Sequence, residues 1–208
     1  MNVKEAYNNW AKQYDSNNNK TRDLEAISLR STLANIPFHY CLEIGCGTGK
    51  NTEWLMQKAM QVTAIDLSEE MLAKAKQKIT DNHVQFIQAD ILNDWAFAKN
   101  QYDLVTFSLV LEHIENLNDI FKKVAQVTIK NGLVYIGELH PFKQYTGTKA
   151  RFDTDEGQQI VTCYNHHISD FIAAAKNNDF KILAIEEFFD DDDKTTIPRI
   201  LTILFQKN

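Results

Sequence analysis

Residues 41–51 read CLEIGCGTGKN, an apolar segment that runs into three glycines on alternate positions and then into a lysine. A strand followed by a glycine-rich turn and a helix is a common ligand-binding unit of α/β proteins. The spacing of the glycines decides which class of ligand such a turn can hold. It therefore also decides how the rest of the chain is interpreted.

Two phosphate-binding motifs fit this turn poorly. A P-loop needs GxxxxGK followed by Ser or Thr, but Ile44 stands at its first glycine and Asn51 at its last position. A dinucleotide site needs GxGxxG, and Lys50 stands at its third glycine. The carboxylate of Glu43 would also repel a pyrophosphate held at the start of the following helix. The turn favours a ligand without phosphates.

S-adenosylmethionine is such a ligand, because it presents an ammonium, a carboxylate and a sulfonium instead of phosphates. Glu43 then complements positive charge. The next two strands also end on acidic residues. Asp66 is placed to accept hydrogen bonds from ribose hydroxyls, and Asp90 from an adenine amino group, with Ile91 adding an apolar contact or a backbone N–H. For each carboxylate, a plain strand-end position in solvent or at a helix start is the alternative.

Around the turn, short apolar runs alternate with segments of helical periodicity, which predicts a parallel sheet covered on both faces. Strands are expected at 39–44, 61–66, 84–89, 102–108 and 133–139. The last third begins with a helical segment. Two apolar runs, FKILAIEEFF and IPRILTILF, follow it and flank DDDDKTT, which predicts a hairpin with a solvated acidic turn. We infer no metal site there.

Composition sets further limits. The 208 residues, 44% of them hydrophobic, are enough for one domain over residues 1–208. A net charge of −6 disfavours binding to a nucleic acid. Three cysteines without CxxC spacing suggest neither disulfides nor zinc, so we expect a reducing, cytoplasmic location. No stretch has the length of a membrane span. A monomer and a homodimer are both compatible with the sequence.

Four segments together resemble the class I S-adenosylmethionine-dependent methyltransferases, and more narrowly their type 11 small-molecule group, which includes ubiquinone/menaquinone-biosynthesis methyltransferases. The segments are LEIGCGTGKNT, VTAIDLSEEMLAKAK, FIQADI and YDLVTFSLVLEHIENL. The resemblance implies a Rossmann-like, doubly wound seven-stranded sheet of order 3-2-1-4-5-7-6 with strand 7 antiparallel. It also implies in-line methyl transfer from S-adenosylmethionine to a small-molecule acceptor.

The resemblance further implies roles for the residues at the matching positions. The glycine turn would line the methionine part of the cofactor through Gly45, Cys46, Gly47 and Gly49. Glu43 would lie behind this turn. The nucleoside part would be held by Asp66, Leu67, Met71, Asp90 and Ile91, and Ser108 would lie beside the transferring methyl. Core packing is the other explanation of a methionine at helical spacing.

The N-terminal segment AYNNWAKQYD is similar to the opening helix of the family. Tyr7, Trp10, Ala11 and Tyr14 share one helical face, and we expect residues 1–36 to form a helical lid. Trp10 and Tyr14 would then cover the cofactor and exclude water. Core packing explains the same stripe equally well.

The acceptor side is expected beyond the carboxyl ends of the fourth and fifth strands. There the sequence places His113 and His140, and His140 is the first choice for a base or an acceptor contact. Residues 140–166 form an irregular insertion that would roof the substrate, with Tyr145, Tyr164 and His167 as candidate contacts. The alternatives are a helix-start histidine bonded to a backbone carbonyl for His113, a neighbour of a helix N-cap for His167, and aromatics that pin a loop to the core.

Two other functions stay open at this point. One is a nicotinamide-dependent reductase on a related sheet, which the missing third glycine opposes. The other is a module that binds S-adenosylmethionine without catalysis. Nucleic-acid methylation is disfavoured by charge, and because SLVL at 108–111 replaces the [DN]PP[YFW] element of amino-group methylases. The sequence identifies neither the acceptor nor the attacking atom.

Overall fold

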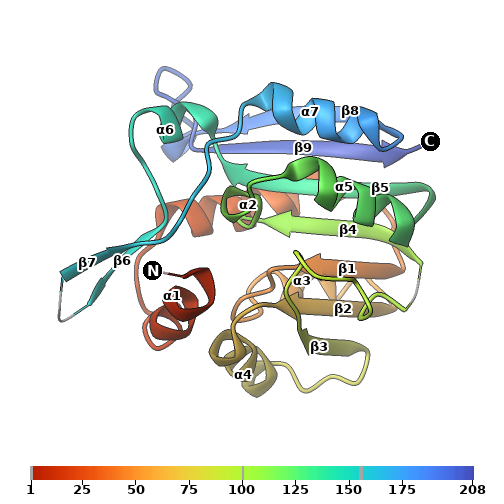
Figure 1. The fold of residues 1–208 in the computed structure, drawn as a ribbon, viewed down its shortest axis with the longest axis horizontal. Helices are drawn as coiled ribbons and strands as arrows, with labels where there is room; N and C mark the ends of the chain where they lie inside the picture. The colour runs from red at the N-terminus through yellow and green to blue at the C-terminus, as the bar shows by residue number, and fades with distance from the viewer. Residues whose placement is uncertain (1, 100, 155–156) are drawn as a thin grey trace.

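A seven-stranded sheet forms the centre of the computed structural model, which describes residues 2–99, 101–154 and 157–208 (Figure 1). Its strand order is β3-β2-β1-β4-β5-β9-β8. The strands are β1 (Tyr40–Ile44), β2 (Gln61–Asp66), β3 (Val84–Gln88), β4 (Tyr102–Ser108), β5 (Thr128–Leu139), β8 (Phe180–Phe188) and β9 (Ile200–Lys207). β9 runs antiparallel to both its neighbours, and the remaining pairs are parallel. The predicted order and the C-terminal hairpin are confirmed.

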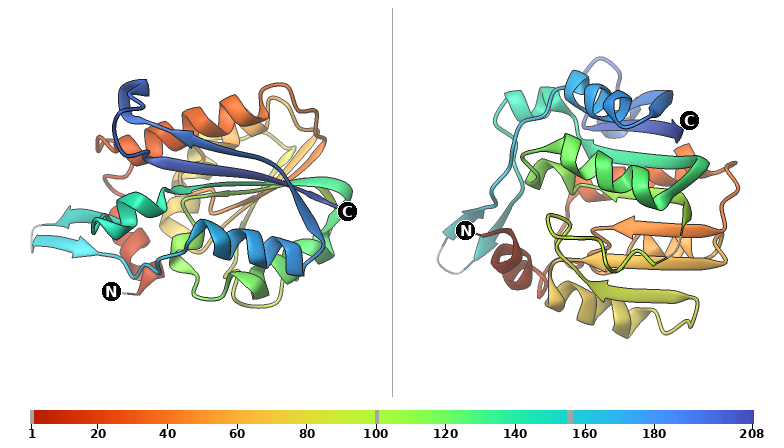
Figure 2. Two further views of the ribbon diagram at one scale, coloured as in Figure 1. Left: turned by 90° about the horizontal axis from the view of Figure 1, so that it is seen from above. Right: turned by 45° about the vertical axis from the view of Figure 1, so that its right-hand side comes forward.

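Helices cover both faces of this sheet (Figure 2). One face carries α2 (Lys20–Leu33), α3 (Thr52–Leu55) and α4 (Glu69–Lys78), and the other carries α5 (Leu117–Val127) and α7 (Ile168–Asn177). Leu42 and Ile44 of β1 belong to the apolar cluster under α5 and α7, whereas Cys41 belongs to the cluster under α2 to α4. Strands buried on both faces explain why the sequence shows continuous apolar runs.

Two helices are shorter than the periodicity suggested. α1 (Val3–Trp10) ends before Ala11 and Tyr14, which lie in the turns that follow. The run of Asp, Ser and Asn after them favours turns, and Asn19 then caps α2 by accepting from the N–H of Arg22 at 3.0 Å. The segment after α3 likewise continues as turns to residue 58, and the backbone N–H groups of residues 56–58 bond three or four residues back.

The insertion at 140–166 has more regular structure than expected. It contains α6 (Pro141–Tyr145) and a two-stranded sheet of β6 (Arg151–Thr154) and β7 (Gly157–Ile160), which extends away from the main sheet (Figures 1 and 2). Strands of four residues give too little periodicity to be recognised in a sequence. The short helices η1 (Leu111–His113) and η2 (Asp190–Asp192) complete the described elements.

The acidic run lies in the turn of the C-terminal hairpin as predicted, and two of its carboxylates accept hydrogen bonds: Asp193 from Thr195 and Asp190 from Arg199. Asp190 accepts two hydrogen bonds at 2.6 Å from Arg199, which explains the lowered pKa of its carboxyl. None of the helices in the described parts of the chain combines the length and apolar character needed to cross a membrane.

Candidate active site

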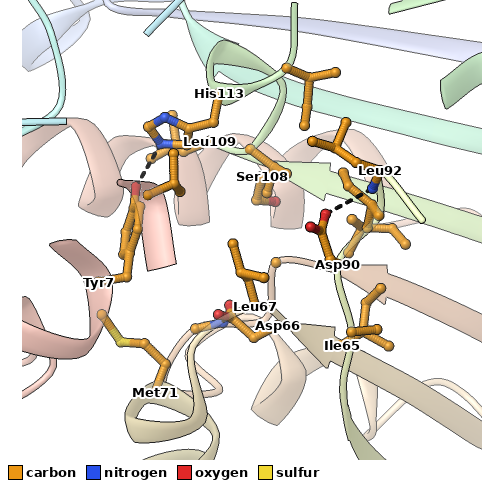
Figure 3. Close-up of a pocket in the computed structure, with 18 of the residues that line it drawn as sticks. Tyr7, Ile65, Asp66, Leu67, Met71, Asp90, Leu92, Ser108, Leu109 and His113 are labelled. Atoms are coloured by element: carbon orange, nitrogen blue, oxygen red, sulfur yellow. Dashed lines mark hydrogen bonds between the residues drawn. The ribbon is translucent and has the colours of Figure 1, made fainter. Parts of the chain in front are cut away.

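The main pocket lies at the carboxyl ends of β1, β2 and β4, beneath α1 (Figure 3). Its volume is about 390 Å³. This is the crevice in which open α/β sheets bind their ligands. The wall combines the glycine turn, residues that follow β2, β3 and β4, and two tyrosines of the N-terminal segment. The charged side chains that line it are Asp66 and Asp90, and neither lysine nor arginine lines it within the described chain.

The glycines of the turn have different tasks. All three have positive φ: +74° at Gly45, +54° at Gly47 and +87° at Gly49. A Cβ on Gly45 would lie 2.2 Å from Cγ2 of Val110, so the packing of Val110 leaves no room for a side chain at this position. At Gly47 the nearest atom is a Tyr14 ring carbon at 4.0 Å, and the backbone is open to the pocket. Gly49 packs on α4 instead of lining the main pocket.

Asp66 ties the glycine turn to the end of β2. Its Oδ2 accepts from the N–H of Gly47 at 2.8 Å, and its Oδ1 accepts from the N–H of Ser68 at 2.8 Å. Burial raises the pKa of this carboxyl, and the backbone donors oppose that rise. Asp66 therefore fixes the shape of the turn, and each oxygen retains a lone pair that can accept from a ligand.

The ends of β2 and β3 give the pocket an apolar side. Asp90 accepts from the N–H of Leu92 at 2.9 Å, which folds the chain after β3 into a turn. Apolar residues from the end of β2, from the segments after β2 and β3, and from α4 line this side of the pocket: Ile65, Leu67, Met71, Ala89, Ile91 and Leu92. The arrangement suits a flat base with one polar edge.

A small cavity of about 40 Å³ continues the site past the glycine turn. It shares Tyr14, Gly45, Gly47, Ser108 and Leu109 with the main pocket. Two buried carboxylates lie in its wall, Glu25 from α2 and Glu43 from β1, and Cys46 lines it too. Sequence reasoning missed Glu25, since a glutamate in a helix carries no signal of burial.

Both carboxylates are held by side-chain donors. Thr52 donates from Oγ1 to Glu43 at 2.6 Å, and burial raises the pKa of Glu43 to about 8. Asn51 donates from Nδ2 to Glu25 at 2.9 Å, and burial raises the pKa of Glu25 to about 7. The same Asn51 amide lies 3.3 Å from Oγ of Ser108. The end of β4 is thereby connected to the glycine turn.

Arg22 and Lys50 are the cations that line this small cavity within the described residues, and Lys50 is paired with Asp23. The guanidinium of Arg22 donates to the backbone carbonyls of Tyr14 and Asn17, the second at 2.8 Å, and lies 5.0 Å above the centre of the Tyr14 ring. Through these contacts, Arg22 fixes the segment that connects α1 to α2 over the glycine turn. It was not singled out from the sequence, because an arginine near a helix start is commonly exposed.

The aromatic stripe of the N-terminal segment divides between two tasks. Tyr14 lines the main pocket as expected, and Tyr7 joins it. Trp10 lies outside the main pocket, packed in a cluster with Ala6 and Met71. Trp10 therefore packs in this cluster instead of covering the main pocket, and it also lines a second cavity beside that pocket.

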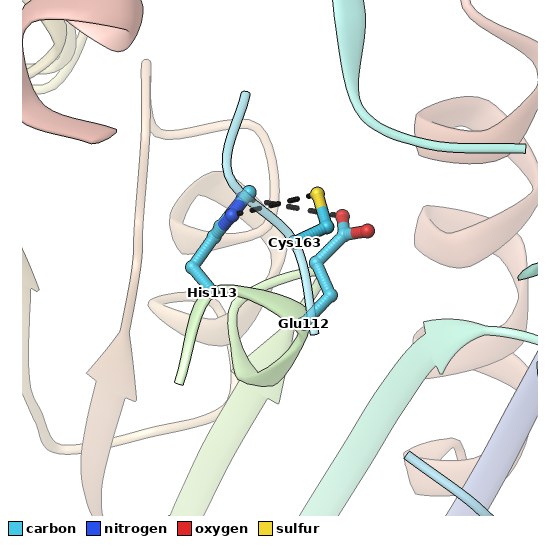
Figure 4. A group of neighbouring side chains, drawn as sticks. All are labelled: Glu112, His113 and Cys163. Atoms are coloured by element: carbon cyan, nitrogen blue, oxygen red, sulfur yellow. Dashed lines mark hydrogen bonds and ion pairs between the residues drawn. The ribbon is translucent and has the colours of Figure 1, made fainter. Parts of the chain in front are cut away.

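His113 lies at the pocket with both ring nitrogens engaged (Figure 3). Nε2 lies 2.9 Å from the Tyr7 hydroxyl, and Nδ1 lies 2.8 Å from the carbonyl of Thr162. Behind the ring, His113 groups with Glu112 and Cys163, whose potential metal-binding atoms lie within 4.8 Å of one another (Figure 4). The bonds of His113 explain its position in this group without a metal.

His140 is placed differently from the expectation. Its side chain is fully buried, lies outside the main pocket, and begins α6 by accepting from the N–H of Phe142 at 3.2 Å. The other ring nitrogen lies 3.0 Å from a carboxylate oxygen of Glu187. We correct the assignment of His140 as a base, because both of its nitrogens serve the fold.

The three candidate substrate contacts also separate. Tyr164 lines the main pocket, and its backbone N–H donates to the carbonyl of Glu112 at 2.7 Å. Tyr145 and His167 lie outside that pocket and pair with each other, hydroxyl to Nδ1, at 2.6 Å. His167 begins α7, as the alternative interpretation had it. Leu109 and Val110, which follow β4, line the pocket and were missed as ordinary apolar residues.

Comparisons with known proteins agree with this site. Residues 42–136 match the methyltransferase domain family. A malonyl-[acyl-carrier protein] O-methyltransferase of Priestia megaterium is 29% identical over 79% of this chain and 56% of its own length. A ubiquinone biosynthesis O-methyltransferase of Azoarcus is 32% identical over 50% of this chain and 46% of its own. The chain spans about half the length of these two relatives.

Solved structures agree in fold as well. A crystal structure described as a putative S-adenosylmethionine-dependent methyltransferase from Listeria monocytogenes superposes with a TM-score of 0.75, at 25% identity, over 89% of this chain and 99% of that one. The DhpI–SAH complex gives a TM-score of 0.76 at 20% identity over 98% and 94%, which shows the shared fold. In its family match and its fold, the chain is thus similar to the S-adenosylmethionine-dependent methyltransferases.

Proposed function

We propose that the protein transfers a methyl group from S-adenosylmethionine to a small-molecule acceptor. The observation that carries this proposal is the charge of the main pocket, where Asp66 and Asp90 are present and no lysine or arginine lines the wall within the described residues. A paired phosphate group would meet repulsion there. A sulfonium and two ribose hydroxyls would meet acceptors.

The residues present fit each part of this cofactor. Asp66 and Asp90 offer free lone pairs to the ribose and to the adenine amino group, and the apolar residues after β2 and β3 enclose the base. The methionine end would lie on the open backbone of Gly47 and reach the small cavity. There Arg22 offers a positive charge for its carboxylate.

The chain acts on the reaction mainly by positioning. When bound, S-adenosylmethionine supplies a methyl group on a cationic sulfur; the acceptor's lone pair forms the new bond while the sulfur keeps the electron pair of the old one. Tyr7, Tyr14 and Leu109 line the pocket, where they would confine the reacting atoms and exclude water. Such placement supplies much of the rate, so no protein nucleophile is needed.

His113 is the proposed acceptor of a proton released by the substrate. Its Nδ1 faces the Thr162 carbonyl, which can only accept, so Nδ1 carries the ring proton and Nε2 is the basic nitrogen. Nε2 accepts from the Tyr7 hydroxyl at 2.9 Å, and that hydroxyl lies on the pocket wall. A proton can therefore pass from the acceptor through Tyr7 to His113.

Four further expectations belong to this proposal. Residues 1–36 would act as a lid, since Tyr7 and Tyr14 lie over the pocket, and residues 140–166 would roof the acceptor. A cytoplasmic location is supported by three free cysteines, Cys41, Cys46 and Cys163. A monomer or homodimer is proposed.

Catalysis itself can be tested by mass spectrometry. The purified protein is incubated with a metabolite extract and S-adenosylmethionine carrying a CD₃ group. We expect at least one metabolite that gains a deuterated methyl, and expect none with a Tyr7→Phe/His113→Gln double variant. Cofactor binding without labelled product would instead favour a non-catalytic binding module.

A further inference from the structure

A second cavity of about 250 Å³ opens beside the main pocket. The two share Tyr7, Tyr14 and Leu109, so a molecule in the second cavity reaches the place where the transferring methyl is expected. Residues from α1, from the start of α2 and from the segment before β6 enclose it. Its position makes it the space for the acceptor, an assignment that rests on the proposed function.

The charge of this cavity is opposite to that of the main pocket. Lys20, Lys149, Arg151 and Arg199 line it, against the single carboxyl group of Glu112. The whole chain carries a net charge of −6, so a cluster of this sign departs from the average surface. Asp190 already neutralises Arg199, whereas Lys20, Lys149 and Arg151 are exposed at the cavity.

The backbone adds to the same electrostatic effect. α2 begins at Lys20 after its cap Asn19, and Asn19, Lys20 and Thr21 line the cavity. The first N–H groups of a helix have no partners within the helix, and the helix dipole places positive charge at that end. A 14-residue helix therefore directs donors toward the same space as the three cations.

The interior of the cavity differs from its charged rim. Tyr7, Trp10 and Tyr14 supply aromatic faces to it. Glu112 is 5% exposed, and its Oε2 has no hydrogen-bond partner in the described structure. Burial raises the pKa of Glu112, which favours a neutral carboxyl group whose O–H can donate a hydrogen bond to a ligand oxygen instead of repelling it. An acceptor with an apolar body and an acidic end satisfies both regions.

We infer that the methyl acceptor is an anionic small molecule, whose carboxylate or phosphoryl group binds between Lys149, Arg151 and the start of α2. Its apolar part would then lie against the aromatic side chains, with the reacting atom directed past Leu109 toward the main pocket. In this arrangement the acidic group fixes the position of the acceptor. The atom that receives the methyl group is either an oxygen of the acidic group or an atom elsewhere on the acceptor.

The test uses the full-length protein saturated with S-adenosylhomocysteine, titrated in a calorimeter with benzoate, phenyl phosphate, inorganic phosphate and neutral benzamide. We expect at least one anion to bind, and benzamide to bind at least about tenfold more weakly, as loss of charge-assisted hydrogen bonds predicts. The anion that binds best distinguishes a carboxylate from a phosphoryl acceptor.

Matched variants locate the effect. Lys149→Gln/Arg151→Gln should weaken binding of that anion about tenfold or more, whereas Lys122→Gln/Lys130→Gln, which removes two exposed lysines elsewhere, should leave it unchanged. Equal binding of benzamide, no binding of any anion, or an unchanged Lys149→Gln/Arg151→Gln variant would overturn the inference. The proposed function would survive these results as long as S-adenosylhomocysteine binds, and it fails separately if that compound does not bind.

Discussion

The hydroxyl of Tyr7 donates a hydrogen bond to Nε2 of His113 over 2.9 Å, which joins α1 to the segment after β4 at the mouth of the main pocket (Figure 3). The direction of this bond follows from the other side of the ring, where Nδ1 donates to the carbonyl of Thr162. The N-terminal helix is thus held over the pocket by a side chain that also lines it.

Replacing this hydroxyl tests the lid. Tyr7→Phe keeps the ring but removes the bond to His113, and a hydrogen bond of this kind contributes about 1 kcal/mol. We expect the dissociation constant for S-adenosylhomocysteine to rise about three- to tenfold in calorimetry. Tyr40→Phe, at an exposed tyrosine of β1, is the control and should change nothing. Equal affinity of Tyr7→Phe and the wild type would remove the closing role.

The glycine turn can be tested with two alanines. Gly45→Ala creates a 2.2 Å approach to Val110 and strains a residue of positive φ, so we expect lower stability and at least about tenfold weaker cofactor binding. Gly147→Ala strains a similar φ of +91° with no atom within 4 Å, so it should cost only about 1 kcal/mol of unfolding free energy. Urea unfolding and calorimetry separate the two effects.

A third substitution addresses the carboxylate that ties the turn. Asp66→Asn would bring an amide N–H against the backbone N–H of Gly47 or Ser68, since both Asp66 oxygens accept from these groups. Losing a charge-assisted bond costs about 1.5–3 kcal/mol, which corresponds to at least about tenfold weaker binding of S-adenosylhomocysteine. Asp94→Asn, at an exposed position after β3, is the control. Retained affinity in Asp66→Asn would count against the ribose assignment.

The buried carboxyl of Glu43 makes stability depend on pH. Its pKa is raised from the ordinary 4.5 to about 8 by burial, so the folded chain binds a proton that the unfolded chain releases between these values. Its contribution to stability is therefore complete below pH 4.5 and is lost as the pH rises toward 8. Glu43→Gln keeps an oxygen that accepts from Thr52 without this titration.

Urea unfolding of both proteins between pH 5 and 8 measures the effect. We expect the free energy of unfolding of Glu43→Gln to fall less steeply with rising pH than that of the wild type, by up to about 1.4 kcal/mol per pH unit. Glu115→Gln, at an exposed residue, should follow the wild type. Parallel curves for Glu43→Gln and the wild type would show that Glu43 is ionised in the folded state.

The sheet was predictable because its evidence is local and repeated. Each strand of a parallel sheet is a short apolar run, and residues 102–108 and the antiparallel hairpin were located by that pattern. Asp66 and Asp90 could be placed because carboxyl ends of parallel strands share one edge. The hairpin of β6 and β7 could not be found, because strands of four residues carry no clear period.

Side-chain direction explains the other errors. His140 and His113 both follow a strand, yet His140 turns into the protein to cap α6 while His113 turns to the pocket. Similarly, Trp10 and Tyr7 share one helical stripe, and only Tyr7 reaches the main pocket. The sequence alone does not show this difference in either pair. The difference arises from packing partners, Glu187 for His140 and Met71 for Trp10, that are distant in the chain.

The central claim is that the main pocket binds an adenosyl amino acid and excludes phosphates. Its most direct test is calorimetric titration of the purified protein with S-adenosylhomocysteine and, separately, with NADH. The acidic wall formed by Asp66 and Asp90 predicts binding of S-adenosylhomocysteine with one site per chain and no heat of binding with NADH. Binding of NADH together with no response to S-adenosylhomocysteine would contradict the account.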